Sequence, residues 1–198
     1  MNNPVKYYLA AYNLVAFCFW TAYLLMFASA GFRINERSLI ILNIAQGMAI
    51  LEILHAGLKW VKSPVMSTAA QVFSRVLVVV LIDVFFFTYE QWPIHITSIG
   101  IIIVSTAWGI TELVRYSFYF LSLFDIQPRA LLWIRYTFFI VLYPLGVTGE
   151  WLIIITPLVI HFTFGLYAAM VAVLAASYIY YFPVLYMYMW KQRKARLG

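Results

Sequence analysis

Long apolar runs separated by short polar segments dominate the chain. Several windows in these runs reach the ~20 residues that a helix needs to cross a bilayer. Prolines fall near the breaks between the runs, where a missing backbone donor costs least: Pro64, Pro93, Pro128 and Pro157. The pattern predicts six helices, at about 7–30, 38–60, 69–89, 95–122, 130–149 and 162–190. The segment 150–160 either prolongs the fifth helix or connects it to the sixth at the membrane interface.

The composition excludes a water-soluble domain. Of the 198 residues, 65% are hydrophobic and 10% are charged, whereas soluble proteins carry about 25% charged residues. Barrel strands alternate in polarity over ~10 residues, but these runs are continuously apolar. We therefore predict an all-α, polytopic membrane protein with six transmembrane helices in one domain, 1–198. The first run lacks a small-residue cleavage site, which indicates a retained helix.

The net charge of +6 is unevenly distributed among the predicted loops. Arg33 and Arg37 lie on one side of the membrane, and the remaining basic loop and tail residues lie on the other: Lys6, Lys59, Lys62, Arg129, Lys191, Arg193, Lys194 and Arg196. The positive-inside rule makes the second side, with both termini and the tail 190–198, cytosolic. Topology and contact with anionic lipid explain the charge without a nucleic-acid partner.

Ionisable residues inside spanning helices are costly and need partners, water or a function. The second to fifth predicted helices carry Glu52, His55, Arg75, Asp83, Glu112, Arg115, Arg135 and Glu150. The first and sixth carry none, so we expect these two to face more lipid. Counting from the cytosolic ends places one layer roughly 8 to 10 Å deep, consisting of His55, Arg75, Arg115 and Arg135.

Two interpretations of this layer stay open. Glu52 and Glu112 precede His55 and Arg115 by three residues, so internal ion pairs could neutralise the charges. Three arginines against two carboxylates would also leave a positive surplus, which suits an anionic ligand such as a phosphate.

A phenol and a carboxylate are expected deeper in the fifth helix. Tyr143 lies eight residues beyond Arg135, and Glu150 follows Tyr143 by seven residues on the same helical face. Pro144, Gly146 and Gly149 make a regular helix doubtful there. A phenol and a carboxylate in an apolar setting suit general acid–base chemistry, although Tyr143 alone could equally be a packing tyrosine.

Four segments together resemble the 3-hydroxyacyl-CoA dehydratase family of very-long-chain fatty-acid elongation, also called protein tyrosine phosphatase-like. They are LEILHAGLKWVKSPV (51–65), QVFSRVLVV (71–79), WGITELVRYSFYFL (108–121) and WIRYTFFIVLYPLGVTGE (133–150). The resemblance spans most of the second to fifth helices, and the first and sixth helices add little to it.

The resemblance implies an endoplasmic-reticulum enzyme that converts (3R)-3-hydroxyacyl-CoA to trans-2-enoyl-CoA. It makes Tyr143 and Glu150 catalytic and assigns the family's other characteristic positions to substrate binding: Arg75, Glu112, Arg115, Arg135 and Gly146. Coenzyme A is then part of the substrate, with no separate cofactor and no metal. Other elongation enzymes become possible partners beside membrane lipid. Asp83 falls in no recognised family segment.

Other functions fit less well. A cysteine phosphatase needs a thiolate and a phosphate-cradling arginine in one loop, and Cys18, which we expect to be buried in an aromatic run, has no arginine near it. A transporter or scramblase would show an inverted repeat, and we find none in the sequence. A bis-histidine haem site needs two histidines at one depth, whereas the histidines here are predicted at different depths. The serious alternative is a catalytically inactive structural or accessory membrane protein of the same fold.

Overall fold

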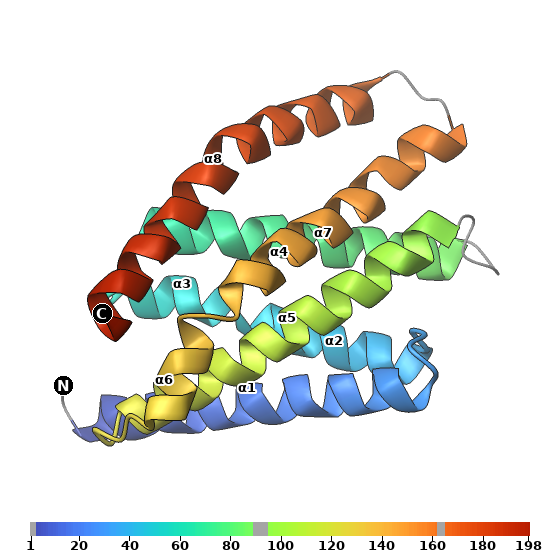
Figure 1. Ribbon diagram of the computed structural model, residues 1–198. Helices are drawn as coiled ribbons and strands as arrows, with labels where there is room; N and C mark the ends of the chain where they lie inside the picture. The colour runs from blue at the N-terminus through green and yellow to red at the C-terminus, as the bar shows by residue number, and fades with distance from the viewer. Residues whose placement is uncertain (1–2, 89–94, 162–164) are drawn as a thin grey trace. The chain divides into compact units, whose positions relative to one another are not determined.

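The computed structural model describes residues 3–88, 95–161 and 165–198, and Figure 1 shows their arrangement as a ribbon. All regular elements in these ranges are helices. They are α1 (Asn3–Ser29), α2 (Glu36–Met48), α3 (Ile50–Gly57), α4 (Val65–Thr88), α5 (His95–Ser122), α6 (Arg129–Arg135), α7 (Phe139–His161) and α8 (Leu166–Leu197).

Six helical segments are long and apolar enough to cross a membrane: Asn3–Ser29, Glu36–Gly57, Val65–Thr88, Thr97–Ser122, Phe139–Leu158 and Ala168–Leu197. Their order matches the six predicted helices. This confirms the predicted class, an all-α polytopic membrane protein. The orientation of the termini stays a prediction.

The second predicted helix is divided in two at Ala49. The N–H of Ala49 donates to the carbonyl of Gln46, which tightens the last turn of α2 before α3 begins at Ile50. Gly47, a weak helix former, precedes this break. At the other end, Asn35 and Ser38 form a reciprocal capping box. The box starts α2 at Glu36, two residues before the predicted start.

The fifth predicted helix also differs from the prediction. It consists of the short α6 and the long α7, and α7 includes the segment 150–160 whose assignment was open. Pro144 and Pro157 both lie inside α7, so neither a break at Pro157 nor an irregular backbone around Pro144 is found. Pro93 lies outside the described residues.

A side chain from α8 helps α7 accommodate Pro144. Proline has no N–H, so the carbonyl four residues earlier loses its helical donor. That carbonyl belongs to Ile140, and the hydroxyl of Tyr186 donates to it at 3.4 Å. Such replacement donors are a usual way for membrane helices to tolerate proline.

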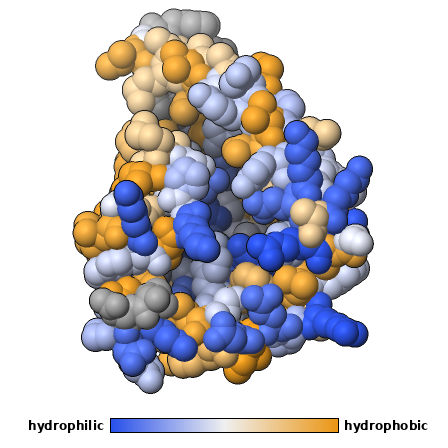
Figure 2. Space-filling model, turned by 90° about the vertical axis from the view of Figure 1, so that its left-hand side faces the viewer, coloured by the Kyte–Doolittle hydropathy of each residue, from blue (hydrophilic) through white to orange (hydrophobic). Residues whose placement is uncertain are grey.

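The chain forms two compact units that share α5. The first unit contains α1 to α4 and the part of α5 that starts at Glu112, and the second contains the part of α5 up to Thr111 with α6, α7 and α8. The prediction of one domain over 1–198 stays a prediction. Many large apolar side chains on the helices of both units are exposed, as the orange surface in Figure 2 illustrates.

In the first unit, α1 packs on α2, and α4 packs on α2 and α3. The start of α1, the end of α3 and the start of α4 lie at the left in Figure 1. Trp20, Tyr23 and Phe27 form an aromatic column inside α1's packed face, each at most 1% exposed. In the apolar part of α1, 39% of the residues are buried, whereas in that of α8 only 6% are. The spans in α4 and α7 bury 28% each. The expectation that the first helix faces more lipid than the inner helices is therefore wrong, and that for the sixth is supported.

In the second unit, α5 and α7 approach closely at two glycines. A Cβ added at Gly149 would lie 2.9 Å from the Gly100 carbonyl oxygen and 2.7 Å from Val104 Cγ2. Farther along the same interface, the hydroxyls of Thr97 and Thr156 are 2.9 Å apart. Small residues that let backbones approach are typical of helix pairs in membranes.

We predict that Gly149→Ala destabilises the protein by about 1 to 3 kcal/mol, because the added methyl meets backbone atoms that cannot move aside. The matched control is Gly47→Ala in α2, where no atom lies within 4 Å of an added Cβ. It should stabilise by up to about 1 kcal/mol through helix propensity. Thermal unfolding in detergent measures both, and equal shifts would contradict the close approach.

Candidate active site

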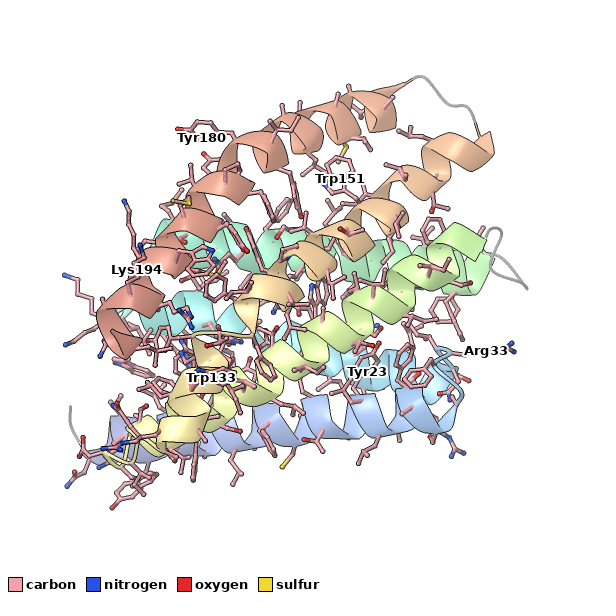
Figure 3. The ribbon with its side chains drawn as sticks, in the orientation of Figure 1. Tyr23, Arg33, Trp133, Trp151, Tyr180 and Lys194 are labelled. Carbon is pink, nitrogen blue, oxygen red and sulfur yellow. The ribbon has the colours of Figure 1, made fainter. Side chains whose placement is uncertain are left out.

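The residues predicted for the site are divided between the two units. The first unit holds Glu52, Arg75, Glu112 and Arg115, and the second holds Arg135, Tyr143, Gly146 and Glu150. Figure 3 shows the side chains of both units on the ribbon. Each group is described by itself below.

In the first unit, two arginines and two glutamates form a continuous ion-pair network. Arg115 directs its fork at Glu52, with Nη1 to Oε2 at 2.5 Å and Nη2 to Oε1 at 2.7 Å. Its Nε donates to Glu112 Oε2 at 2.7 Å, and Arg75 pairs with the other oxygen of Glu112. Glu112 is 1% exposed. Two cations therefore neutralise two anions, of which Glu112 is buried and Glu52 partly buried.

Tyrosines complete the hydrogen bonding of this network. The hydroxyls of Tyr12 and Tyr116 donate to Glu52 Oε1 at 3.1 and 2.7 Å. Tyr12 comes from α1, whose predicted span 7–30 carries no charge. His55, 2% exposed, is hydrogen bonded to Tyr8 of α1 at 3.0 Å. Tyrosines of the first helix therefore take part in the polar interior.

This geometry confirms the ion-pair interpretation for Glu52, Arg75, Glu112 and Arg115. The predicted surplus of positive charge depended on Arg135, which belongs to the second unit and whose guanidinium lies 5.8 Å from the ring of Tyr136. A layer that includes Arg135 stays a prediction.

The second unit presents a buried carboxylate with neutral donors. Glu150 is 8% exposed. Trp108 Nε1, from α5, donates to Oε1 at 3.0 Å, and the Tyr178 hydroxyl, from α8, donates to Oε2 at 2.5 Å. Both carboxylate oxygens thus accept a hydrogen bond from an uncharged side chain. Gly146 lies one turn before Glu150, and its Cβ position is 3.8 Å from the Trp108 indole.

Tyr143 lies two turns before Glu150 on the same face of α7, about 10 Å along the axis. Its ring stacks on Phe182, with centroids 5.0 Å apart, and on Tyr186 at 6.3 Å. Tyr178, Phe182 and Tyr186 follow one another at four-residue intervals, so they form one stripe along α8. Helix α8 therefore carries the aromatic surface that meets both Tyr143 and Glu150.

Trp151 and Tyr180 mark the two sides of this interface in Figure 3. Trp151 extends from α7 toward α8 and meets the ring of Tyr178 edge to face at 5.5 Å. Tyr180, two residues after Tyr178, points away from α7 and is 67% exposed. The two tyrosines therefore have the same phenol group in opposite environments.

Sequence reasoning did not identify Trp108 and Tyr178. Trp108 opens the segment WGITEL, four residues before Glu112, so its place beside a recognised polar position was a usable signal. Tyr178 is one of 15 tyrosines. Nothing in its local sequence separates it from Tyr180 or Tyr181.

Two further residues can now be placed. The amide of Asn43 donates to Asp83 Oδ1 at 2.8 Å, and both line a groove of about 350 Å³ between α2 and α4. Asp83 thus has a structural partner in the first unit.

Cys18 is exposed on the apolar outer surface of α1. The expectation that it is buried was therefore wrong.

Among the described residues, no group of three or more His, Cys, Asp and Glu side chains could hold a metal ion. That the reaction needs neither a metal nor a separate cofactor stays a prediction.

Comparison with known proteins gives consistent matches. The model of the family described as protein tyrosine phosphatase-like protein, PTPLA, matches residues 46–198. A very-long-chain (3R)-3-hydroxyacyl-CoA dehydratase of Caenorhabditis elegans is 38% identical, covering 98% of this chain and 96% of its own. The Arabidopsis thaliana dehydratase PASTICCINO 2 is 31% identical, and the match covers 98% of this chain and 94% of the Arabidopsis protein.

The mouse very-long-chain (3R)-3-hydroxyacyl-CoA dehydratase 2 is 37% identical over 79% of this chain. The match spans 65% of the mouse protein's length. No solved structure matches the chain significantly.

We predict that Glu112→Gln costs about 3 to 5 kcal/mol of stability, because it leaves Arg75 and Arg115 with one carboxylate fewer in a buried network. Glu36→Gln is the matched control. Glu36 is exposed in the first turn of α2, where its loss should cost less than about 1 kcal/mol. Thermal unfolding in detergent compares them, and similar shifts in the two variants would show that the network is not stabilising.

Proposed function

The chain belongs to the protein tyrosine phosphatase-like family, and on that premise we propose that it dehydrates very-long-chain (3R)-3-hydroxyacyl-CoA to trans-2-enoyl-CoA. The relatives named above carry this activity in their names. One observation in this chain supports it most: Glu150 is buried, held by two neutral donors, and shares a face of α7 with Tyr143.

The reaction needs one base and one acid. Glu150 takes the proton from carbon two of the substrate, which the thioester already acidifies, and the electron pair of that bond forms the carbon–carbon double bond. The hydroxyl leaves carbon three with a proton from the Tyr143 phenol, and water is released. A proton returns from Glu150 to Tyr143 to complete the cycle. The opposite assignment, with Tyr143 as base, uses the same two groups and balances equally.

The partners of the three intramembrane glutamates favour Glu150 for this task. Glu52 and Glu112 are bound by arginine guanidiniums, and a carboxylate neutralised by a cation is a weak base. Trp108 and Tyr178 supply hydrogen bonds without a positive charge. They fix the orientation of the Glu150 carboxylate and leave it able to accept a proton.

The remaining predicted positions have different support. Gly146 packs beside the Trp108 indole, which makes room for the donor that binds Glu150. The family resemblance assigns Arg75, Glu112, Arg115 and Arg135 to substrate binding, while the contacts of the first three support a role in holding the helices of the first unit together.

We place the enzyme in the endoplasmic-reticulum membrane with both termini cytosolic. The distribution of basic residues supports this orientation. In the first unit, the start of α1, which contains Lys6, lies at the left in Figure 1, as do the ends of α3 and α4 on either side of Lys59 and Lys62. Arg33 extends from the right in Figure 3. Contacts with other fatty-acid elongation enzymes remain part of this proposal.

We predict that Tyr143→Phe and Glu150→Gln each lower turnover at least ~100-fold, the low end of what a positioned acid or base contributes. The assay measures formation of trans-2-enoyl-CoA by purified protein in detergent. Tyr180→Phe and Glu36→Gln make the same chemical changes at exposed positions and should leave turnover unchanged. Wild-type rates in both Tyr143→Phe and Glu150→Gln would refute the catalytic assignment and favour the accessory alternative.

We predict that Tyr178→Phe lowers kcat about 10-fold with little change in KM. It keeps the ring against Trp151 and removes only the hydroxyl that positions Glu150. In a Glu150→Gln background the same change should add less than about 3-fold, because residues that act as a unit are not additive. A full additional 10-fold loss there would show that Tyr178 does not act through Glu150.

A further inference from the structure

A basic cleft lies where α6 meets the last turns of α8 in the second unit. It encloses about 260 Å³ and is lined by Trp133, Arg193, Lys194, Leu197 and Gly198. Figure 2 looks at the side of the molecule where α8 ends and shows hydrophilic side chains projecting between apolar ones. Trp133 and Lys194 are labelled in Figure 3. The mechanism proposed above uses none of these residues.

The chemistry of the lining suits a phosphate beside a flat aromatic base. Arg193 Nε is buried and has no hydrogen-bond partner among the described residues, so it can donate to a ligand. Lys194 adds a second, exposed positive charge. No lining side chain is acidic. The Trp133 indole is 50% exposed and offers a stacking surface, and an arginine fork matches phosphate geometry.

We propose that this cleft binds the phosphorylated adenosine end of the coenzyme A ester. This inference rests on the proposed function, because it concerns the same substrate. The cleft is slightly smaller than the ~300 to 1,000 Å³ usual for a whole drug-sized ligand. It therefore suits one end of a long molecule whose other parts lie elsewhere on the protein.

The position of the cleft along α8 agrees with that assignment. Tyr178 contacts Glu150, Tyr186 stacks on Tyr143, and Arg193 follows Tyr186 by seven residues. At ~1.5 Å per residue, Arg193 is about 10 Å beyond Tyr186 and about 22 Å beyond Tyr178 along the helix. Coenzyme A separates its thioester from its adenosine phosphates by an extended pantetheine arm. An ester lying along α8 would place its thioester at the catalytic pair and its phosphates at the cleft.

The arginines of the first unit are poorer candidates for the same task. Arg75 and Arg115 are bound to Glu112 and Glu52, so phosphate would have to displace carboxylates from buried pairs at considerable cost. Among the described residues Arg193 and Lys194 form no ion pair, so a phosphate in the cleft would displace no paired carboxylate. The phosphate of a lipid head group has the same chemistry, and the experiment separates these two sources.

The test compares two double variants with equal loss of charge. Arg193→Gln with Lys194→Gln removes both cleft cations, and Lys191→Gln with Arg196→Gln removes two exposed cations of the same helix end that do not line the cleft. Each protein is assayed with a (3R)-3-hydroxyacyl-CoA and with the matching pantetheine thioester, which lacks adenosine and its phosphates.

We expect the cleft variant to raise KM for the coenzyme A ester at least ~10-fold, which corresponds to the loss of one charge-assisted hydrogen bond. Its kcat, and its KM for the pantetheine ester, should stay unchanged, and the control variant should behave as wild type. Equal effects in the two variants would overturn the proposal. So would weaker binding to vesicles of anionic lipid with no change in KM, which would assign the cleft to a lipid head group.

Binding of adenosine 3′,5′-bisphosphate to the detergent-solubilised protein, measured by calorimetry, separates this inference from the proposed function. If wild type turns over neither ester, the dehydratase assignment fails. The bisphosphate should still bind wild type and the control variant, and bind the cleft variant at least ~10-fold more weakly. Equal affinity in all three proteins would overturn the cleft assignment by itself.

Discussion

A carboxylate inside a membrane-spanning helix is stable only where donors meet its oxygens, and this requirement organises both units of the protein. An unpaired carboxylate in an apolar medium would cost many kcal/mol or take up a proton. Glu52 and Glu112 meet the requirement with Arg75 and Arg115, and two tyrosines complete the shell around Glu52. Glu150 meets it with an indole and a phenol. The first arrangement neutralises charge with arginines, and the second holds the proposed base with two uncharged donors.

Helix packing makes the second solution possible. The close approach of α5 to α7 at Gly100 and Gly149 brings the Trp108 indole within reach of Glu150. From the other side, the aromatic stripe of α8 supplies the Tyr178 hydroxyl to Glu150, a stacking surface to Tyr143 and a donor to the carbonyl that Pro144 leaves without a partner. One face of α8 thus supports Tyr143 and Glu150, the proposed catalytic pair, and helps α7 stay regular at Pro144, although most of α8's surface is exposed.

The fold class and part of the site could be predicted from the sequence, for physical reasons. Apolar runs of bilayer length define the spans whatever their neighbours are, and Glu112 with Arg115 pair because three residues nearly complete a turn. The tyrosine donor to Glu150 could not be predicted, since which of 15 tyrosines meets a given carboxylate depends on the rotation of two helices. The helix break expected at Pro157 is absent, because proline marks a helix end in water more reliably than in a membrane. The role of α1 was missed because its contribution consists of tyrosine hydroxyls, which carry no charge.

The most direct measurement of the central claim is product formation by the purified wild-type protein. It is incubated in detergent with the (3R)- or the (3S)-isomer of a very-long-chain 3-hydroxyacyl-CoA, and trans-2-enoyl-CoA is quantified by mass spectrometry. The account predicts repeated turnover of the (3R)-isomer and little of the (3S)-isomer, with no metal or cofactor added. Folded protein that forms no enoyl product from either isomer would contradict it.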